Sequence, residues 1–199
     1  MLEVFIWLGT ITFAVSGTLV AVQKRFDIIG ALVLASVSAV GGGAIRDIVV
    51  GSLPPASLRN ETLAWVVALS SVATFYLHRF IRAEGRLLYS LDTVGLAIFA
   101  ALGAEQGIAF DLGMWGTIFM GAISGVGGGV LRDVLSGQIP GIFYRSGDFY
   151  ATAAAAGALT VYLLHDLNAN LAVIAGILLT LVMRVGSRVL GLRLPVSRQ

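Results

Sequence analysis

Seven apolar segments, separated by short polar connections, run through the 199-residue chain. Each is close to the roughly 20 residues that an α-helix needs to cross the hydrocarbon core of a bilayer. The pattern therefore predicts an all-α integral membrane protein with seven transmembrane helices. The predicted spans lie near residues 3–22, 28–50, 62–80, 88–106, 113–135, 148–166 and 170–190.

The composition supports a membrane protein. Hydrophobic residues make up 57% of the chain and charged residues 12%, whereas a soluble domain carries about 25% charged residues. Little sequence remains outside the spans, so we expect a single membrane domain over residues 1–199. Glu3 is the only charged residue before Lys24. Because a signal peptide begins with a basic segment, we expect the first span to be a retained helix.

Basic residues gather on one side of the predicted membrane. Ten lie on that side, Arg59 lies on the other, and Arg46 and Arg132 fall at membrane depth. Cytoplasmic loops carry the excess of Lys and Arg, so we expect the N-terminus outside and the C-terminus in the cytoplasm. These positions account for the basic pI without a nucleic-acid partner. The ten residues are Lys24, Arg25, Arg79, Arg82, Arg86, Arg145, Arg184, Arg188, Arg193 and Arg198.

The chain also matches itself, without gaps, when it is shifted by 86 positions. Gly9 then aligns with Gly95 and Phe13 with Phe99. We therefore expect two three-helix repeats and a seventh helix with a cytoplasmic tail. Because each repeat has an odd number of spans, the second enters the membrane from the opposite side, as in many transporters with a pathway at the repeat interface. The expected boundaries are 1–86, 87–168 and 169–199.

A Gly-Gly-Gly-x-x-Arg-Asp motif occurs at equivalent places in both repeats. Three adjacent glycines weaken a helix by roughly 1 kcal/mol each relative to alanine. A packing stripe needs a small residue only at every fourth position. The triplets therefore predict a kink or a break in the second and fifth spans, near the membrane midplane, although packing alone stays open. The motif comprises Gly41, Gly42, Gly43, Arg46 and Asp47, and then Gly127, Gly128, Gly129, Arg132 and Asp133.

The charged residues of the motif are expected near the two mouths of a path through the membrane, too far apart for the two copies to pair with each other. Adjacent residues of a helix point about 100° apart, so we expect each charge to have a separate partner. A structural network between helices and a direct role in permeation both remain open. Asp92 follows Ser90 near the start of the fourth span, where a helix cap is favoured over the lining of a cytoplasmic vestibule.

The sequence does not favour an enzyme. Gly125 to Gly129 is followed neither by Gly-Lys-Ser/Thr nor by a complete Gly-x-Gly-x-x-Gly, so it is not a nucleotide-binding loop. No His and carboxylate residues have metal-ligand spacing, and there is no cysteine. We expect no cofactor and no metal site. The expected ligands are a permeant potassium or sodium ion and membrane lipid.

The duplicated motif in a three-plus-three-plus-one membrane protein resembles the prokaryotic TRIC (trimeric intracellular cation) channel homologues, once grouped only as uncharacterised membrane proteins. The resemblance implies a homotrimer in the prokaryotic inner membrane. It also implies a potassium-permeable hourglass pore in each subunit, with the triplets at its centre. Animal members carry a Lys-Glu-Val motif linked to phosphoinositide binding. This chain lacks that motif, so such regulation is not expected.

Two functions follow from these features. The first is a monovalent cation channel. The alternative is a secondary transporter for a small amino acid such as glycine, because some bacterial relatives have been associated with glycine uptake. In a transporter, the amide end of a broken helix would meet a carboxylate and the carbonyl end an ammonium group. A non-conducting scaffold would leave the charges at membrane depth unexplained.

Overall fold

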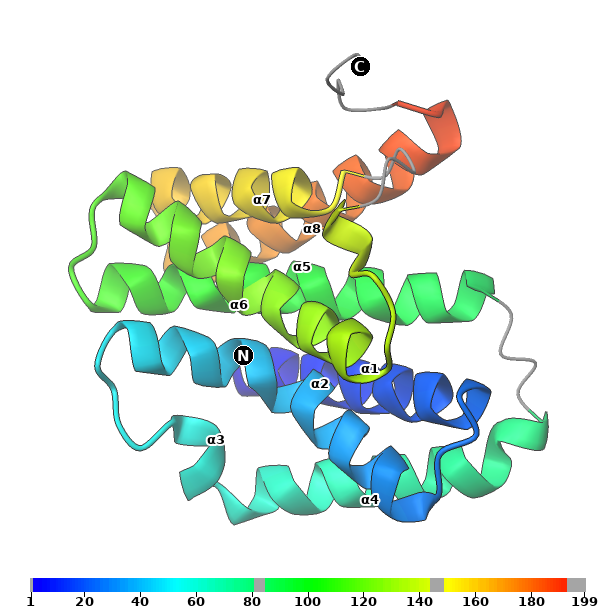
Figure 1. Ribbon diagram of the computed structural model, residues 1–199. Helices are drawn as coiled ribbons and strands as arrows, with labels where there is room; N and C mark the ends of the chain where they lie inside the picture. The colour runs from blue at the N-terminus through cyan, green and yellow to red at the C-terminus, as the bar shows by residue number, and fades with distance from the viewer. Residues whose placement is uncertain (1, 81–84, 144–148, 193–199) are drawn as a thin grey trace.

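The computed structural model describes residues 2–80, 85–143 and 149–192, which fold into a bundle of helices (Figure 1). Arg82, Arg145, Arg193 and Arg198 lie outside these ranges. Two short 3₁₀ helices, His78–Phe80 and Gly141–Phe143, also occur. The α-helices are α1 (Leu2–Gln23), α2 (Ile28–Val49), α3 (Ala56–Arg59), α4 (Glu61–Leu77), α5 (Gly85–Ala109), α6 (Met114–Leu135), α7 (Ala151–Leu164) and α8 (Ala169–Leu190).

Seven helices fall at the seven predicted places, but not all of them have the predicted length. Six helices in the described part of the chain are long and apolar enough to cross a membrane, and α7 is a shorter apolar helix of 14 residues. At 1.5 Å per residue, α7 is about 21 Å long. The predicted span began at 148, which lies outside the described residues. The backbone N–H of Phe149 donates to Ser187 Oγ of α8 (3.1 Å), and the helix begins only at Ala151.

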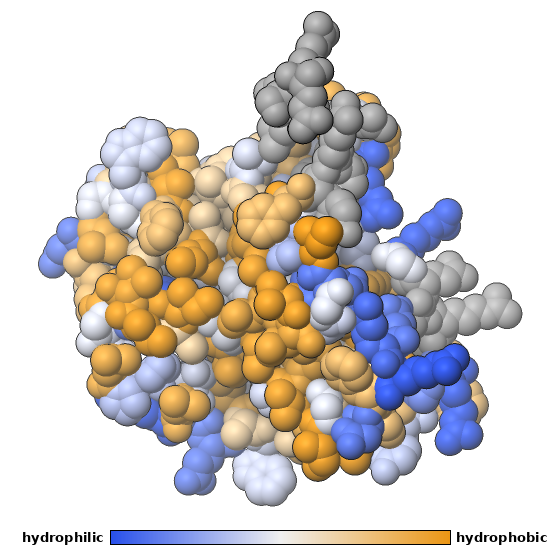
Figure 2. Space-filling model, in the orientation of Figure 1, coloured by the Kyte–Doolittle hydropathy of each residue, from blue (hydrophilic) through white to orange (hydrophobic). Residues whose placement is uncertain are grey.

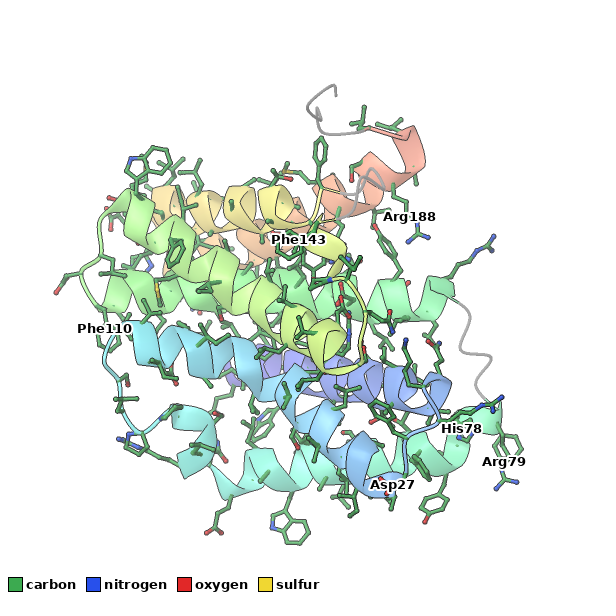
Figure 3. The ribbon with its side chains drawn as sticks, viewed as in Figure 1. Asp27, His78, Arg79, Phe110, Phe143 and Arg188 are labelled. Atoms are coloured by element: carbon green, nitrogen blue, oxygen red, sulfur yellow. The ribbon has the colours of Figure 1, made fainter. Side chains whose placement is uncertain are left out.

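Four helices form the centre of the bundle. α1, α2, α5 and α6 pack on one another, and α4 covers α1 and α2 (Figure 1). On the other side, α7 covers α5 and α6, and α8 packs on α5 and α7. Apolar side chains spread across the middle of the face in Figure 2, and hydrophilic side chains gather at its right-hand end. Arg79 and Arg188 lie at that same end (Figure 3). The molecule therefore has a hydrophilic end that includes Arg79 and Arg188.

Residues 86 positions apart make equivalent contacts. A methyl group on Gly17 would meet Ser38 Oγ at 2.6 Å and the Leu34 carbonyl oxygen at 2.7 Å. A methyl group on Gly103 would meet Cβ of Ser124 at 2.6 Å and the Met120 carbonyl oxygen at 2.7 Å. α1 therefore crosses α2 as α5 crosses α6, with backbone against backbone.

The expected break in the second and fifth spans is wrong. α2 and α6 each continue as one α-helix through their glycine triplets. The triplets lie where α2 and α6 cross: a methyl group on Gly42 would collide with the Ser124 carbonyl oxygen, and one on Gly128 with that of Ser38. Contacts between the two backbones offset the weak helix propensity of glycine, so the helices persist. The predicted kink in each of these two helices stays a prediction.

Candidate functional site

Two cavities contain the two copies of the Arg-Asp pair. We name them the Arg46 cavity and the Arg132 cavity. Their volumes are about 300 and 290 Å³. The first is lined by α1, α2, α3, the start of α4 and α5, and the second by α1, α5, α6, Gln138 to Gly141, Tyr150 and α8.

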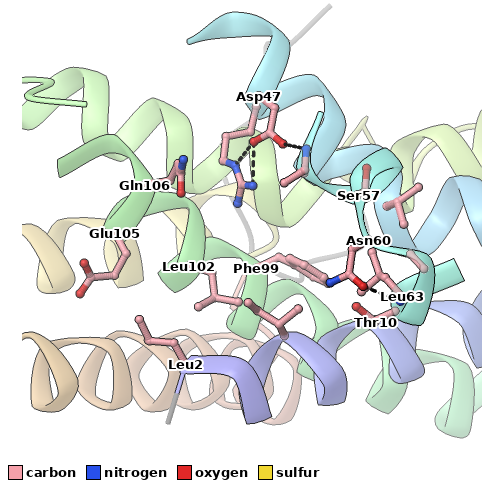
Figure 4. Close-up of a pocket in the computed structure, with 16 residues that line it drawn as sticks. Leu2, Thr10, Asp47, Ser57, Asn60, Leu63, Phe99, Leu102, Glu105 and Gln106 are labelled. Atoms are coloured by element: carbon pink, nitrogen blue, oxygen red, sulfur yellow. Dashed lines mark hydrogen bonds and ion pairs between the residues drawn. The ribbon is translucent and has the colours of Figure 1, made fainter. Parts of the chain in front are cut away.

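In the Arg46 cavity, the two charged residues of the motif bond to each other. Arg46 donates from Nε (2.9 Å) and Nη2 (2.8 Å) to Asp47 Oδ1. Asp47 Oδ2 accepts the backbone N–H of Ala56 at the start of α3 (2.9 Å), as Figure 4 shows. The expectation of separate partners for the two side chains is therefore wrong here, because the long arginine stem folds back across the angle between them.

Other walls of the Arg46 cavity mix polar and apolar groups. Thr10, Asn60 and Glu105 contribute polar atoms, and Phe99 and Leu102 contribute apolar ones (Figure 4). Glu105 Oε1 lies 3.3 Å from Nδ1 of His165, at the end of α7. Sequence reasoning overlooked Glu105, although a carboxylate so near the end of the predicted span at 88–106 was a signal that could have drawn attention to it.

In the Arg132 cavity, the motif joins a larger cluster centred on Asp92. Asp92 Oδ1 accepts from Arg132 Nη1 (2.9 Å) and Asp92 Oδ2 from Arg184 Nη2 (2.7 Å). Arg132 also donates from Nε to Asp133 Oδ1 (2.9 Å) and from Nη1 to Ser16 Oγ (2.6 Å). The side chains of Asp92, Arg132 and Arg184 are only 6%, 7% and 5% exposed. The cluster thus ties α1, α5, α6 and α8 together.

The interpretation of Asp92 as a helix cap is wrong. Helix α5 begins at Gly85, three residues before the predicted start of the span, so Asp92 lies about two turns inside the helix. Both of its carboxylate oxygens bind arginines rather than the backbone N–H groups of a first turn. Asp92 also lines the Arg132 cavity, the role that the sequence disfavoured.

Arg184 is the residue of this cluster that sequence reasoning missed. Its guanidinium carbon lies 4.2 Å from the ring centroid of Tyr150 and 5.0 Å from that of Tyr89. Such cation–π contacts stabilise a desolvated arginine. Tyr89 also donates its hydroxyl to the Arg184 carbonyl oxygen (3.0 Å). From the sequence, Arg184 was only a basic residue near a helix end. No repeat position pointed to it, because α8 has no counterpart in the repeat.

Within each triplet the glycines have different surroundings. Gly42 and Gly128, the middle ones, form the contact between α2 and α6. Gly43 lines the Arg46 cavity, where an added methyl group would have Arg46 Nη2 as its nearest neighbour at 3.8 Å. A methyl group on Gly129 would approach the Tyr150 hydroxyl at 2.5 Å and Asp92 at 3.1 Å. The third glycine therefore faces the Arg46 cavity in the first copy and the side chains of Tyr150 and Asp92 in the second.

The remaining glycines of the motif lie close to the same crossing. A methyl group on Gly41 would meet Cδ1 of Leu131 on α6 at 2.6 Å, and one on Gly127 would meet Cα of Gly42 at 3.0 Å. In the part of the chain that the structure describes, no ion pair joins the two copies of the motif. The placement of the two charged pairs at the mouths of a path stays a prediction.

A family model described as Glycine transporter matches the chain twice, over residues 3–79 and again over residues 89–166. The chain is 45% identical over 192 residues to a UPF0126 membrane protein from Deinococcus radiodurans, covering 96% of this chain and 89% of the relative. It is 37% identical to the UPF0126 inner membrane protein YadS from Escherichia coli strain K12, covering 94% and 91%.

A solved structure has the same fold as this chain. It is a TRIC trimeric intracellular cation channel orthologue from Rhodobacter sphaeroides, with a TM-score of 0.90 and 35% sequence identity. The match covers 96% of this chain and 98% of the solved one. The helical architecture is therefore that of the TRIC structures, and the two cavities lie within it.

Proposed function

Because this chain belongs to the bacterial TRIC/UPF0126 family, we propose that it is a monovalent cation channel of the inner membrane, permeable to potassium. Its similarity to a solved TRIC cation channel supports a cation channel, and the YadS relative supports a multi-pass inner-membrane protein. The observation that carries the proposal is the pair of cavities. They lie towards opposite ends of the bundle, with the crossing of Gly42 and Gly128 between them.

In this proposal the two cavities are the vestibules of an hourglass-shaped pore. The two halves of the chain form an inverted repeat, and their glycine triplets make the narrow centre, where a kink in α2 or α6 would adjust the pore width. With the N-terminus outside, the Arg46 cavity opens outward and the Arg132 cavity opens to the cytoplasm. The concentration of basic residues at the Arg132 end supports this orientation.

The charges have two roles in the proposed pore. The bonds of Asp92 to Arg132 and Arg184 hold four helices around the cytoplasmic vestibule, so they fix its shape. In the outer vestibule, the carboxylate of Glu105 attracts cations, because a cavity with low-dielectric walls focuses the field of a charge at its surface. Ions would meet the Arg46–Asp47 and Arg132–Asp133 pairs at opposite mouths.

We further propose a homotrimer in which each subunit has its own pore. The similar structure from Rhodobacter sphaeroides is of a trimeric channel, and this supports self-association. Membrane lipid would surround the trimer. The permeant cation is transported rather than held as a cofactor, and neither an enzymatic reaction nor nucleic-acid binding is part of the proposal.

Recordings from purified protein in planar bilayers test the channel. With different potassium chloride concentrations on the two sides, we expect an ohmic current that reverses near the potassium equilibrium potential. The Gly42→Ala variant should change the conductance while the trimer remains intact, because the methyl group would push α2 and α6 apart. Bilayers that stay electrically silent with parent protein of confirmed trimeric state would contradict the proposal.

A glycine transporter is the second candidate, because the matching family model carries that description. The test is uptake of radiolabelled glycine into liposomes under gradients of sodium, protons or potassium. Saturable uptake together with silent bilayers would replace the channel with the transporter. A potassium current without uptake under any of these gradients would leave the channel alone.

A further inference from the structure

Two phenylalanine side chains stack on each other inside the bundle. The ring centroids of Phe13 on α1 and Phe99 on α5 are 5.5 Å apart, and the ring planes differ by only 8°. Phe13 is 1% exposed and Phe99 is 9% exposed. The two residues are 86 positions apart, so each half of the chain contributes the same position to one aromatic pair.

Each ring lies against a glycine of the opposite half. A methyl group on Gly95 would approach the ring of Phe13 at 2.8 Å, and a methyl group on Gly9 would approach that of Phe99 at 2.9 Å. Such distances are too short for real carbon contacts, so only glycine leaves room for the two rings. Each ring of the stack therefore lies directly against the backbone of the helix from the other half.

The stack lies between the two cavities. On α1, Thr10 lines the Arg46 cavity and Val20 lines the Arg132 cavity, with Phe13 between them. On α5, Asp92 lines the Arg132 cavity, and Phe99, seven residues on, forms a wall of the Arg46 cavity. Seven residues of helix correspond to about 10 Å.

The stack also adjoins the narrow crossing of α2 and α6. A methyl group on Gly128 would lie 3.6 Å from Cε2 of Phe13. The rings and the middle glycines therefore belong to one layer of the molecule, which separates one vestibule from the other. The glycines bring the four central helices together, and the rings fill the space that remains at the contact of α1 and α5.

We propose that the Phe13–Phe99 stack is the permeation barrier between the two cavities, an inference that rests on the proposed channel function. An apolar constriction excludes water and blocks ions by dewetting. A hydrated cation in either vestibule cannot shed its water against two hydrocarbon rings. Conduction therefore requires the two rings to separate, and a smaller side chain at either position lowers the barrier.

The chain contains no cysteine, which allows the barrier to be mapped with a single introduced thiol. Gly43→Cys places it in the Arg46 cavity, where a side chain at this position has room. A membrane-impermeant thiol reagent is added to membrane vesicles of each orientation. We expect labelling only from the side to which the Arg46 cavity opens. Adding Phe99→Ala should abolish this sidedness, so that the reagent reaches the thiol from both sides.

Bilayer recordings provide the second measurement. We expect potassium conductance to rise several-fold from the parent to Phe99→Leu and further to Phe99→Ala. Phe119→Ala is the matched control. Phe119 lies on α6 with 56% of its surface exposed, and its removal should leave both conductance and sidedness unchanged. If Phe99→Ala does not assemble, Phe99→Leu keeps an apolar side chain in place and is tested for a partial loss of sidedness.

The outcomes separate the barrier from the channel. Labelling of the parent from both sides, or sided labelling that survives Phe99→Ala, would overturn the barrier whatever the current shows. Loss of sidedness in a protein that conducts no potassium would support the barrier and reject the potassium channel, because the reagent does not depend on which solute normally passes. Loss of sidedness together with a raised potassium current supports both.

Discussion

The Arg46 and Arg132 cavities start from the same seven-residue motif, yet their arginines are held very differently. Arg46 pairs with its neighbour Asp47 alone among the acidic groups, in the part of the chain that the structure describes. Arg132 bonds to two carboxylates, those of Asp133 and Asp92, and to Ser16. Arg46 is 14% exposed and Arg132 is 7% exposed. Few side-chain bonds therefore hold Arg46 at one end of the molecule, whereas a network of bonds to several helices holds Arg132 at the other end.

The difference arises outside the motif. The position equivalent to Asp92, 86 residues earlier, is Ile6, so the first half has no central carboxylate. Arg184 comes from α8, which lies outside the two matched stretches. Duplication thus supplied a charge pair at each end, and residues outside the pair turned one of them into a four-helix network. Two copies of the same motif can therefore contribute differently to the stability of the protein.

The two cavities also differ in net charge. The Arg46 cavity has one arginine against two carboxylates, those of Asp47 and Glu105. The Arg132 cavity has three arginines, Arg132, Arg184 and Arg188, against the carboxylates of Asp92 and Asp133. The first is therefore negative by one charge and the second positive by one. In the proposed channel, cations would accumulate more readily in the Arg46 cavity, and the layer formed by Phe13, Phe99, Gly42 and Gly128 would separate two cavities of opposite net charge.

Asp92→Asn should have the largest effect on stability. The substitution removes the carboxylate that balances the buried positive charges of Arg132 and Arg184. Removing one partner of a buried ion pair costs about 3–5 kcal/mol. We expect that loss in the free energy of unfolding of the detergent-solubilised protein, measured by chemical denaturation. The unfolding midpoint of Asp92→Asn should lie well below that of Asp47→Asn. Equal midpoints would show that the two ends are held alike.

Gly42→Ala and Gly128→Ala test the layer that the two cavities share. Each methyl group would collide with the equivalent carbonyl oxygen, of Ser124 or Ser38. Overpacking costs about 1–3 kcal/mol, and the better helix propensity of alanine returns up to about 1 kcal/mol. We expect similar losses of about 2 kcal/mol in the two variants, measured by denaturation. Unequal losses would indicate that the crossing is not equivalent in the two halves.

Gly43→Ala is the matched control for these two variants. Its methyl group would have Arg46 Nη2 as its nearest neighbour, at an ordinary contact distance of 3.8 Å, so no overpacking is expected. The variant should unfold at the same denaturant concentration as the parent or slightly above it. A loss as large as that of Gly42→Ala would mean that the triplet resists any side chain, and that the crossing contact is not the reason for the loss.

Six of the helices were predictable because a run of about 20 apolar residues is long enough to cross a membrane as a helix. The spans at 28–50 and 113–135 agree with α2 and α6 to within a residue at each end. The error at the triplets has a clear physical origin. Helix propensity counts the cost of glycine within one helix, and it does not include contacts with a second backbone. Those contacts at Gly42 and Gly128 exist only once the two halves are assembled.

The site was less predictable than the fold. The motif drew attention to Arg46 and Arg132, but their partners lie on other helices or depend on side-chain folding. Asp92 looked like a cap because a shift of three residues in the start of α5 decides whether it lies at the end or inside the helix. Arg184 carried no local signal, since a basic residue near the end of a span is common.

Asp47→Asn should have a modest effect on stability. Arg46 borders a cavity and is partly exposed, so water replaces part of the lost interaction. We expect a loss of about 1 kcal/mol in the free energy of unfolding. Asparagine still accepts the N–H of Ala56, so α3 should stay in place. A loss as large as that expected for Asp92→Asn would contradict the difference in stability between the Arg46 end and the Arg132 end.

Glu105→Gln should leave stability nearly unchanged and reveal the difference in net charge. The amide oxygen can still face His165, and only the negative charge of the Arg46 cavity is lost. We expect a lower inward potassium current at low salt, because screening lengths are then about 10 Å, at about 0.1 M, or longer. At about 1 M salt the length falls to about 3 Å and the difference from the parent should vanish. Single-channel recording at both salt concentrations measures this.

Arg188→Gln is the opposite test at the other cavity. Arg188 is exposed on α8 and lies over the ring of Tyr89, with 3.8 Å between its guanidinium carbon and the ring centroid. Removing its positive charge should raise the potassium current that enters from the Arg132 cavity at low salt, again with no difference at high salt. Changes of the same sign in the two variants would show that net charge does not distinguish the cavities. Opposite signs, both suppressed by salt, would assign the two vestibules opposite fields, because only long-range electrostatics has that salt dependence.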